Sequence, residues 1–147
     1  MVDINAAFAA IRERRDELNT IDDQLSGVIR HVEVALRELQ PGVSTDVDYE
    51  VTDEGTHWLS FQKHNGTWQI MWSNKDDGWH TPLVSASRQV RAEIFNLLPA
   101  GLTPLELLIH EMASSIAEYA AERSGQLERA KKLSAALVAA GIPRPVE

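Results

Sequence analysis

The chain has 147 residues, a formal net charge of -8, 44 % hydrophobic and 24 % charged residues, and no cysteine. This composition predicts one globular domain, residues 1–147, and excludes a disulfide-built scaffold, a thiolate zinc site and a cysteine nucleophile. No apolar run approaches the ~18 residues of a membrane span, and the first residues lack the basic and apolar regions of a signal peptide. We therefore expect a cytoplasmic protein that does not contact membranes.

The acidic charge is concentrated in the middle of the chain. Residues 41–84 carry 7 acidic and 2 basic side chains, whereas residues 85–147 carry 7 of each. Nucleic-acid-binding proteins show the reverse, a basic surface that displaces counterions from phosphates. Direct nucleic-acid binding is therefore not expected. The acidity indicates a solubilising surface or, as an alternative, an acidic mimic of nucleic acid.

Residues 3–39 are predicted to form one long helix that ends at Pro41-Gly42. Apolar residues recur every seven positions, and a second row follows four residues after each member of the first. The first row contains Ile4, Ile11, Leu18, Leu25, Val32 and Leu39, and the second contains Phe8, Arg15, Asp22, Ile29 and Leu36. This spacing is typical of a coiled coil with two polar interruptions.

Residues 103–140 are predicted to form a second long helix. Thr103 and Glu106 make a capping box around Pro104, and Gly141 ends the helix. Ser124-Gly125 marks a point where it could break or kink. An antiparallel alignment of the two helices places Leu39 beside Leu105 and Asp22 beside Arg123, and a two-helix stalk of this kind favours a homodimer.

The segment 46–73 is predicted to form a three-stranded antiparallel meander, with strands at 46–53, 57–63 and 67–73. Asn65-Gly66 between two alternating runs indicates a two-residue hairpin turn, which pairs Phe61 with Ile70 and Leu59 with Trp72. A three-residue turn at 54–56 would pair Val51 with Leu59 and Tyr49 with Phe61.

Alternation of side chains then sorts the sheet into two faces. The predicted core face comprises Val47, Tyr49, Val51, Leu59, Phe61, Trp68, Ile70 and Trp72. The predicted outer face comprises Asp46, Asp48, Glu50, Trp58, Ser60, Gln62, Gln69 and Met71. A short helix at 85–98 is expected to cover the core face, because a three-stranded meander alone is marginally stable in water. The fold class is thus α+β and mostly helical, with two long antiparallel helices flanking a small head.

Motifs of known chemistry are absent from the sequence. It contains neither a phosphate-binding glycine loop nor a Gly-x-Ser-x-Gly elbow, and His110-Glu111 lacks the second histidine of a zinc helix because Ser114 stands there. His57 and His80 could approach Asp53 or Asp77, but no complete metal-ligand set can be named. We therefore expect no catalytic residue, no cofactor and no metal.

The sequence favours a non-enzymatic protein-interaction module of the inhibitor, antitoxin, regulator or assembly-chaperone type, as in small phage or bacterial proteins. The predicted partner-binding surface is the outer face of the sheet, where carboxylates lie beside an exposed tryptophan, an amide and a methionine. Its residues are Asp48, Glu50, Trp58, Gln69 and Met71.

Two alternatives remain open. A small ligand, such as a nucleotide or metabolite, could bind in the head beside Trp79, His80 and Arg88. An enzyme would most simply use His57, His80 and the carboxylates of the first strand, although these residues imply no substrate class.

Overall fold

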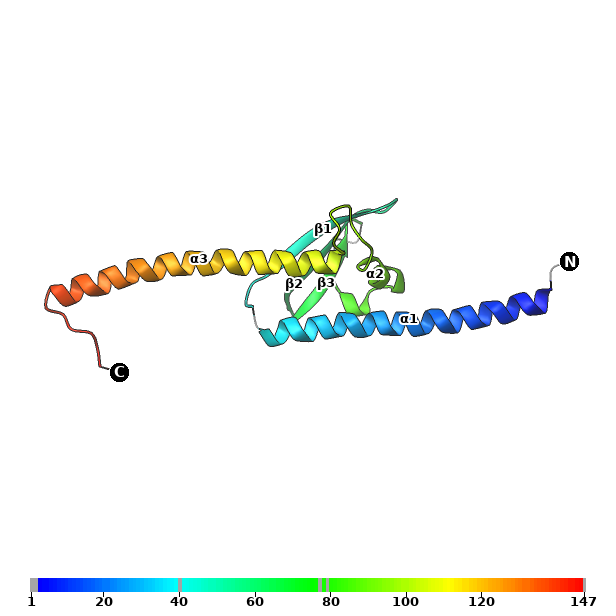
Figure 1. Ribbon diagram of the computed structural model, residues 1–147, viewed down its shortest axis with the longest axis horizontal. Coiled ribbons are helices and arrows are strands. Elements are labelled where there is room, and N and C mark those ends of the chain that lie inside the picture. The colour runs from blue at the N-terminus through cyan, green and yellow to red at the C-terminus, as the bar shows by residue number, and fades with distance from the viewer. Residues whose placement is uncertain (1–2, 40, 77, 79, 147) are drawn as a thin grey trace. The chain divides into compact units, whose positions relative to one another are not determined.

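The computed structural model describes residues 3–39, 41–76, 78 and 80–146 (Figure 1). The chain divides into two compact units, Met1–Met112 and Ala113–Glu147, which are considered separately. The fold is α+β and mostly helical, as predicted. In chain order the elements are α1 (Ile4–Leu39), β1 (Thr45–Val51), β2 (Gly55–His64), β3 (Thr67–Asn74), β4 (Thr81–Pro82), the 3-10 helix η1 (Leu83–Ser85), α2 (Arg88–Glu93) and α3 (Pro104–Ala139).

The sheet has four antiparallel strands in the order β1-β2-β3-β4 rather than the three that were expected. The β2–β3 hairpin has the predicted register, with Phe61 opposite Ile70 and Leu59 opposite Trp72. Its turn residues Asn65 and Gly66 both have positive φ, 51° and 82°, as a tight hairpin turn requires. The added strand β4 has only two residues, which is too short to show an alternating pattern in the sequence.

The register between β1 and β2 differs from the prediction. Val47 lies opposite Leu59, and Tyr49 lies opposite His57 instead of Phe61. The turn comes two residues earlier than expected because Asp53 adopts a left-handed conformation with φ 70°, which aspartate tolerates better than most residues. The pairing register is thereby shifted by four residues, and an even shift leaves every side chain on its predicted face.

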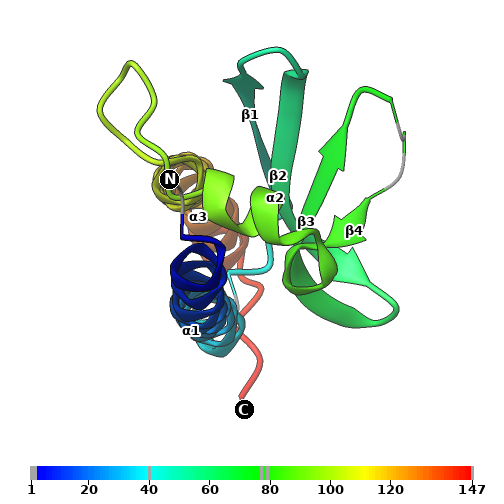
Figure 2. The same ribbon diagram turned by 90° about the vertical axis from the view of Figure 1, so that its right-hand side faces the viewer.

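The core lies between one face of the sheet and the helices α1, α2 and the start of α3, which Figure 2 shows on the same side of the sheet. From the sheet it includes six of the eight predicted core residues, with Val51 and Trp68 partly buried beside them. The helices contribute Ile29, Leu36, Val90, Ile94, Leu105, Leu108 and Met112.

The predicted helix at 85–98 is shorter and is divided in two. The 3-10 helix η1 is followed by α2, whose N-cap is Ser87. The Ser87 Oγ accepts a hydrogen bond from the backbone N–H of Val90 at 3.3 Å, which is how serine starts a helix. Arg88 at the first position of α2 donates a hydrogen bond to Asn19 Oδ1 of α1 at 2.8 Å.

One prediction about the long helices is wrong within the first unit. Over residues 104–112, α3 runs in the same direction as α1 (Figure 1), so the antiparallel pairing of Leu39 with Leu105 is not present there. Periodicity identifies the apolar face of a helix but not its direction. The carboxylate of Asp22 lies 3.7 Å from the guanidinium of Arg88. Arg123, its predicted neighbour, belongs to the second unit.

The second unit contains the rest of α3, which continues through Ser124-Gly125 without the break that was considered possible. The helix ends in a Schellman motif: the N–H of Ile142 bonds to the carbonyl of Leu137 at 2.9 Å, and Gly141 has φ 88°. Large apolar side chains are exposed along this segment, namely Ile116, Tyr119, Leu127, Leu133, Leu137 and Val138. In the part of the chain that the structure describes, no helix combines the length and apolarity needed to cross a membrane.

Candidate functional site

His57 is a buried histidine on the inner face of β2, with only 2 % of its surface exposed. Its ring lies edge-on to Tyr49 and to Trp72, with centroid distances of 5.7 Å and 5.1 Å. The Tyr49 hydroxyl accepts a hydrogen bond from the Trp72 indole N–H at 3.1 Å. Two neighbouring aromatic side chains therefore hold the imidazole in one orientation.

Two carboxylates approach this imidazole, one near each ring nitrogen. Glu54 precedes β2, and its Oε2 lies 3.5 Å from His57 Nε2. Glu93 is the last residue of α2, and its Oε2 lies 3.5 Å from His57 Nδ1. Glu54, His57 and Glu93 thus form a cluster and come from the β1–β2 turn, β2 and α2, respectively. We call it the His57 cluster.

Burial and charge both perturb the acid groups near His57. Burial raises the pKa of Glu93, the nearby Glu54 carboxylate raises it further, and His57 opposes the shift. Burial also raises the pKa of the Tyr49 hydroxyl far above its ordinary range, although the Trp72 hydrogen bond opposes this. The site therefore disfavours negative charge unless a cation or a proton offsets it.

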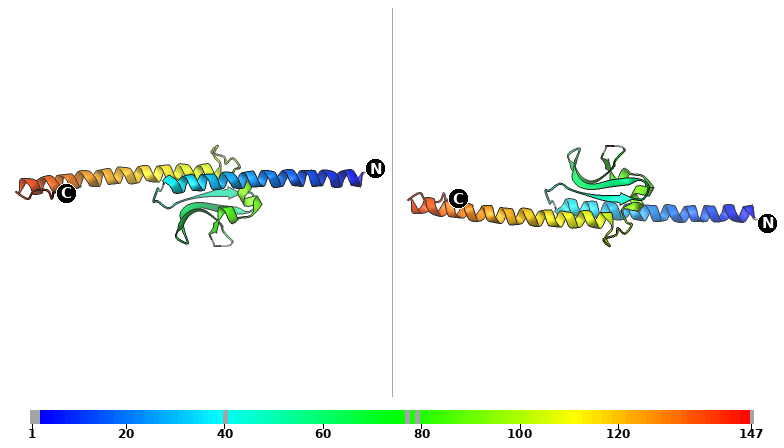
Figure 3. Two further views of the ribbon diagram at one scale, coloured as in Figure 1. Left: turned by 90° about the horizontal axis from the view of Figure 1, so that it is seen from below. Right: turned by 90° about the horizontal axis from the view of Figure 1, so that it is seen from above.

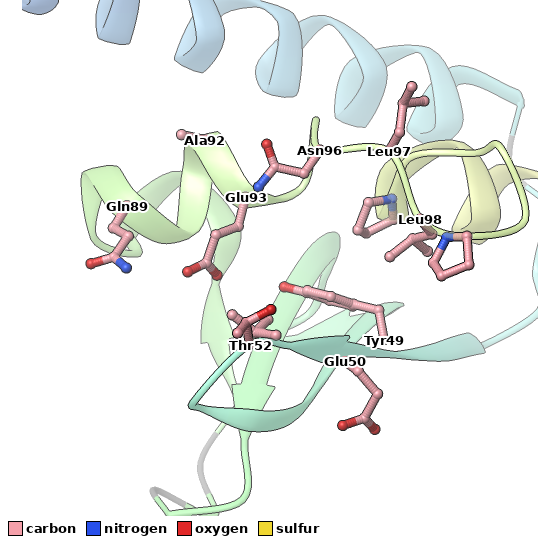
Figure 4. A pocket seen from close by; sticks show the side chains of 12 residues that line it. Tyr49, Glu50, Thr52, Gln89, Ala92, Glu93, Asn96, Leu97 and Leu98 are labelled. Atoms are coloured by element: carbon pink, nitrogen blue, oxygen red, sulfur yellow. The ribbon is translucent and has the colours of Figure 1, made fainter.

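Two cavities meet at Glu93. The smaller one, of about 330 Å³, includes the His57 cluster and also Asp53, Asp76 and Gln89. The larger one, of about 820 Å³, lies between β1 and the segment 89–104. Figure 4 shows Glu93 and Tyr49 reaching toward each other across it, whereas Glu50 points away. Its volume is in the range of small-molecule sites.

The predicted partner-binding residues are only partly accessible. Asp48 and Glu50 are exposed on β1, and Trp58, which lies opposite Asp48 in β2, is half-buried, as is Gln69. Met71 is fully buried and cannot contact a partner in this conformation. The outer face of the sheet is therefore accessible mainly along β1.

The predicted ligand-binding residues are not brought together. Trp79 lies outside the described residues, and His80 is exposed. Arg88 contacts Asn19 and Asp22 of α1 instead of lining a pocket with His80. Asp77, considered as a metal ligand, also lies outside the described residues.

Sequence reasoning considered His57 but not its two carboxylate neighbours. Alternation places His57 on the same face as Leu59 and Phe61, so its burial could have been predicted from the sequence. Glu93 lies between Val90 and Ile94 on the buried side of α2, where a charged residue is unusual. Only the fold shows that the two positions meet.

A second feature is an apolar stripe on the N-terminal half of α1, formed by Ile4, Phe8, Ile11 and Leu18. These side chains are 59 %, 63 %, 63 % and 59 % exposed. Figure 3 shows this half of α1 extending beyond the sheet and α2. The row of Phe8 continues to Ile29 and Leu36, which are buried in the core.

Comparisons of the chain with protein-family models, with curated proteins and with solved structures find no match.

Proposed function

We propose that this protein is a non-enzymatic protein-interaction module that pairs with a second copy of itself through the apolar stripe of α1. The observation that carries the proposal is the exposure of four large apolar side chains, Ile4, Phe8, Ile11 and Leu18, on one face of α1. Burying one such side chain stabilises an assembly by roughly 1.5–3 kcal/mol. Contiguous exposed apolar rows of this kind typically mark interaction surfaces.

The surface around the apolar stripe can accommodate the α1 helix of a second copy. An open cavity of about 500 Å³ follows the stripe and is lined by residues that include Ile11, Leu18 and Arg88. The charged residues beside the stripe are partly neutralised within α1, because Arg14 pairs with Glu17 at 2.7 Å and Arg15 with Asp16 at 3.1 Å. Repulsion between the arginines of two copies is thereby reduced.

The position of the head favours an antiparallel pair. The head covers Ile29, Val32 and Leu36 of α1, so residues 4–18 are the part of this face left open to a partner helix. If the second α1 ran parallel, its own head would compete for the same side of the helix. In an antiparallel pair each head lies beyond the free end of the other helix.

The head supplies a second proposed surface, for a protein partner of another kind. Asp46, Asp48 and Glu50 are exposed on the edge strand β1, with Trp58 beside them. Three carboxylates around an aromatic anchor suit a basic surface. Regulation or inhibition of such a partner is the role that this surface supports.

The test of the stripe is the double variant Ile11→Glu/Leu18→Glu, with Ala6→Glu/Ala9→Glu as matched control. Both variants add two negative charges to exposed positions of α1, but only the first pair lies on the stripe. Light scattering after size exclusion should show a monomer for the stripe variant and a dimer for the control. A dimer that survives Ile11→Glu/Leu18→Glu would contradict the proposal.

A further inference from the structure

The His57 cluster offers one donor atom from each of Glu54, His57 and Glu93, and these atoms lie within 4.8 Å of one another. Acidic clusters alone are common on protein surfaces. This cluster differs because its central member is a histidine with only 2 % of its surface exposed, and because Glu93 is also buried.

Two atoms of the cluster have no hydrogen-bond partner among the residues that the structure describes. They are His57 Nδ1 and Glu93 Oε2, both buried and facing each other at 3.5 Å. Buried polar atoms without a partner are rare because each has lost its hydrogen bonds to water without replacing them. A cation bound between them would be the partner of both atoms.

The distance between His57 Nδ1 and Glu93 Oε2 fits two ligands of one metal ion better than a hydrogen bond. A hydrogen bond between nitrogen and oxygen spans about 2.7–3.2 Å. Two ligands bound tetrahedrally to one zinc ion at about 2.0–2.1 Å lie about 3.3 Å apart. The separation of His57 Nδ1 from Glu93 Oε2 is 3.5 Å, close to the second geometry.

The negative charge of the site also favours a bound cation. Two carboxylates face one imidazole, and Asp53 and Asp76 line the same 330 Å³ cavity, so the cavity attracts cations. Arg91 lies two residues before Glu93 in α2 and donates a hydrogen bond to Ser26 of α1. Among the described residues it forms no ion pair with Glu93.

We propose that Glu54, His57 and Glu93 bind one divalent transition-metal ion of the zinc class. Imidazole and carboxylate are ligands that zinc accepts, and three protein ligands leave a fourth position for water. Glu54 is partly exposed, so the ion can enter from the solvent side. The ion would link the β1–β2 turn to the end of α2. This inference is independent of the α1 stripe.

The test uses the full-length protein stripped with a chelator and then titrated with Zn²⁺ by calorimetry. We expect one ion per chain, a rise in melting temperature on binding, and at least tenfold weaker affinity in Glu54→Gln and Glu93→Gln. Glu50→Gln and His80→Gln, both at exposed positions, should bind as the wild type does. If Glu93→Gln fails to fold, the partly exposed Glu54 still provides the comparison.

A second readout identifies the ligand atom. The ¹⁵N resonance of one His57 ring nitrogen should shift on addition of Zn²⁺, and the shift should be reduced in Glu54→Gln. The proposal is overturned if no saturable binding occurs below about 100 µM Zn²⁺, or if Glu54→Gln and Glu50→Gln bind equally well.

Discussion

The side chain of Glu33 in α1 accepts a hydrogen bond from the backbone N–H of Ile70 in β3, with Oε2 and N 3.0 Å apart. Arg37, one turn later, donates to the carbonyl of Trp68 at 3.0 Å and to Glu33 Oε1 at 2.7 Å. Within the described residues, β4 pairs with β3 only at Met71 and Trp72. Glu33 and Arg37 of α1 therefore form hydrogen bonds with backbone groups of β3 that β4 leaves unpaired. These bonds protect the edge of the sheet from pairing with another chain.

Glu33→Ala should lower the free energy of unfolding by about 1.5–3 kcal/mol, because it removes a charged hydrogen bond and leaves a buried N–H unsatisfied. Urea denaturation monitored by tryptophan fluorescence measures this change. Glu38→Ala, at an exposed position of the same helix, is the control and should change stability by less than about 0.5 kcal/mol. Equal effects of the two variants would show that the Ile70 contact does not stabilise the fold.

Tyr49 should make the protein sensitive to alkali. Burial raises the pKa of its hydroxyl far above the ordinary tyrosine range. The unfolded chain therefore loses this proton at lower pH than the folded chain, so stability present below about pH 10 falls as the pH rises further. In Tyr119→Phe, which leaves Tyr49 as the only tyrosine, tyrosinate absorbance should appear together with unfolding. Ionisation near pH 10 in the folded protein would refute this prediction.

The outer face of the sheet should bind a basic partner. Glu50→Lys/Trp58→Ala should abolish capture of that partner in a pull-down, because it reverses one charge and removes the aromatic anchor. Circular dichroism should remain unchanged, since Glu50 is exposed and Trp58 half-buried. Lys63→Glu, at an exposed β2 position outside this surface, serves as control. If the double variant still captures the partner, the outer face of the sheet is not the binding surface.

Local signals explain which parts of the fold were predictable. Asn65-Gly66 specified one hairpin, and strict alternation identified the core residues of the sheet. The β1–β2 register was missed because the choice of Asp53 over Gly55 as the centre of the turn depends on backbone conformations that composition does not reveal. The direction of α3 was missed because a long connection allows either orientation.

The His57 cluster illustrates a different limit. Glu54 and His57 are three residues apart, but Glu93 is distant in sequence and reaches them only when α2 packs across the sheet. Sequence patterns identify the buried face of each element, whereas the meeting of two elements depends on tertiary packing. By contrast, the apolar stripe of α1 was visible in the sequence because its heptad spacing is local.

The measurement that most directly tests the central claim is sedimentation equilibrium of the wild-type protein over a concentration series from about 1 to 200 µM. Pairing through Ile4, Phe8, Ile11 and Leu18 predicts a mass that rises with concentration toward twice the chain mass of 16.4 kDa. A mass of 16.4 kDa throughout the series would contradict self-association through α1.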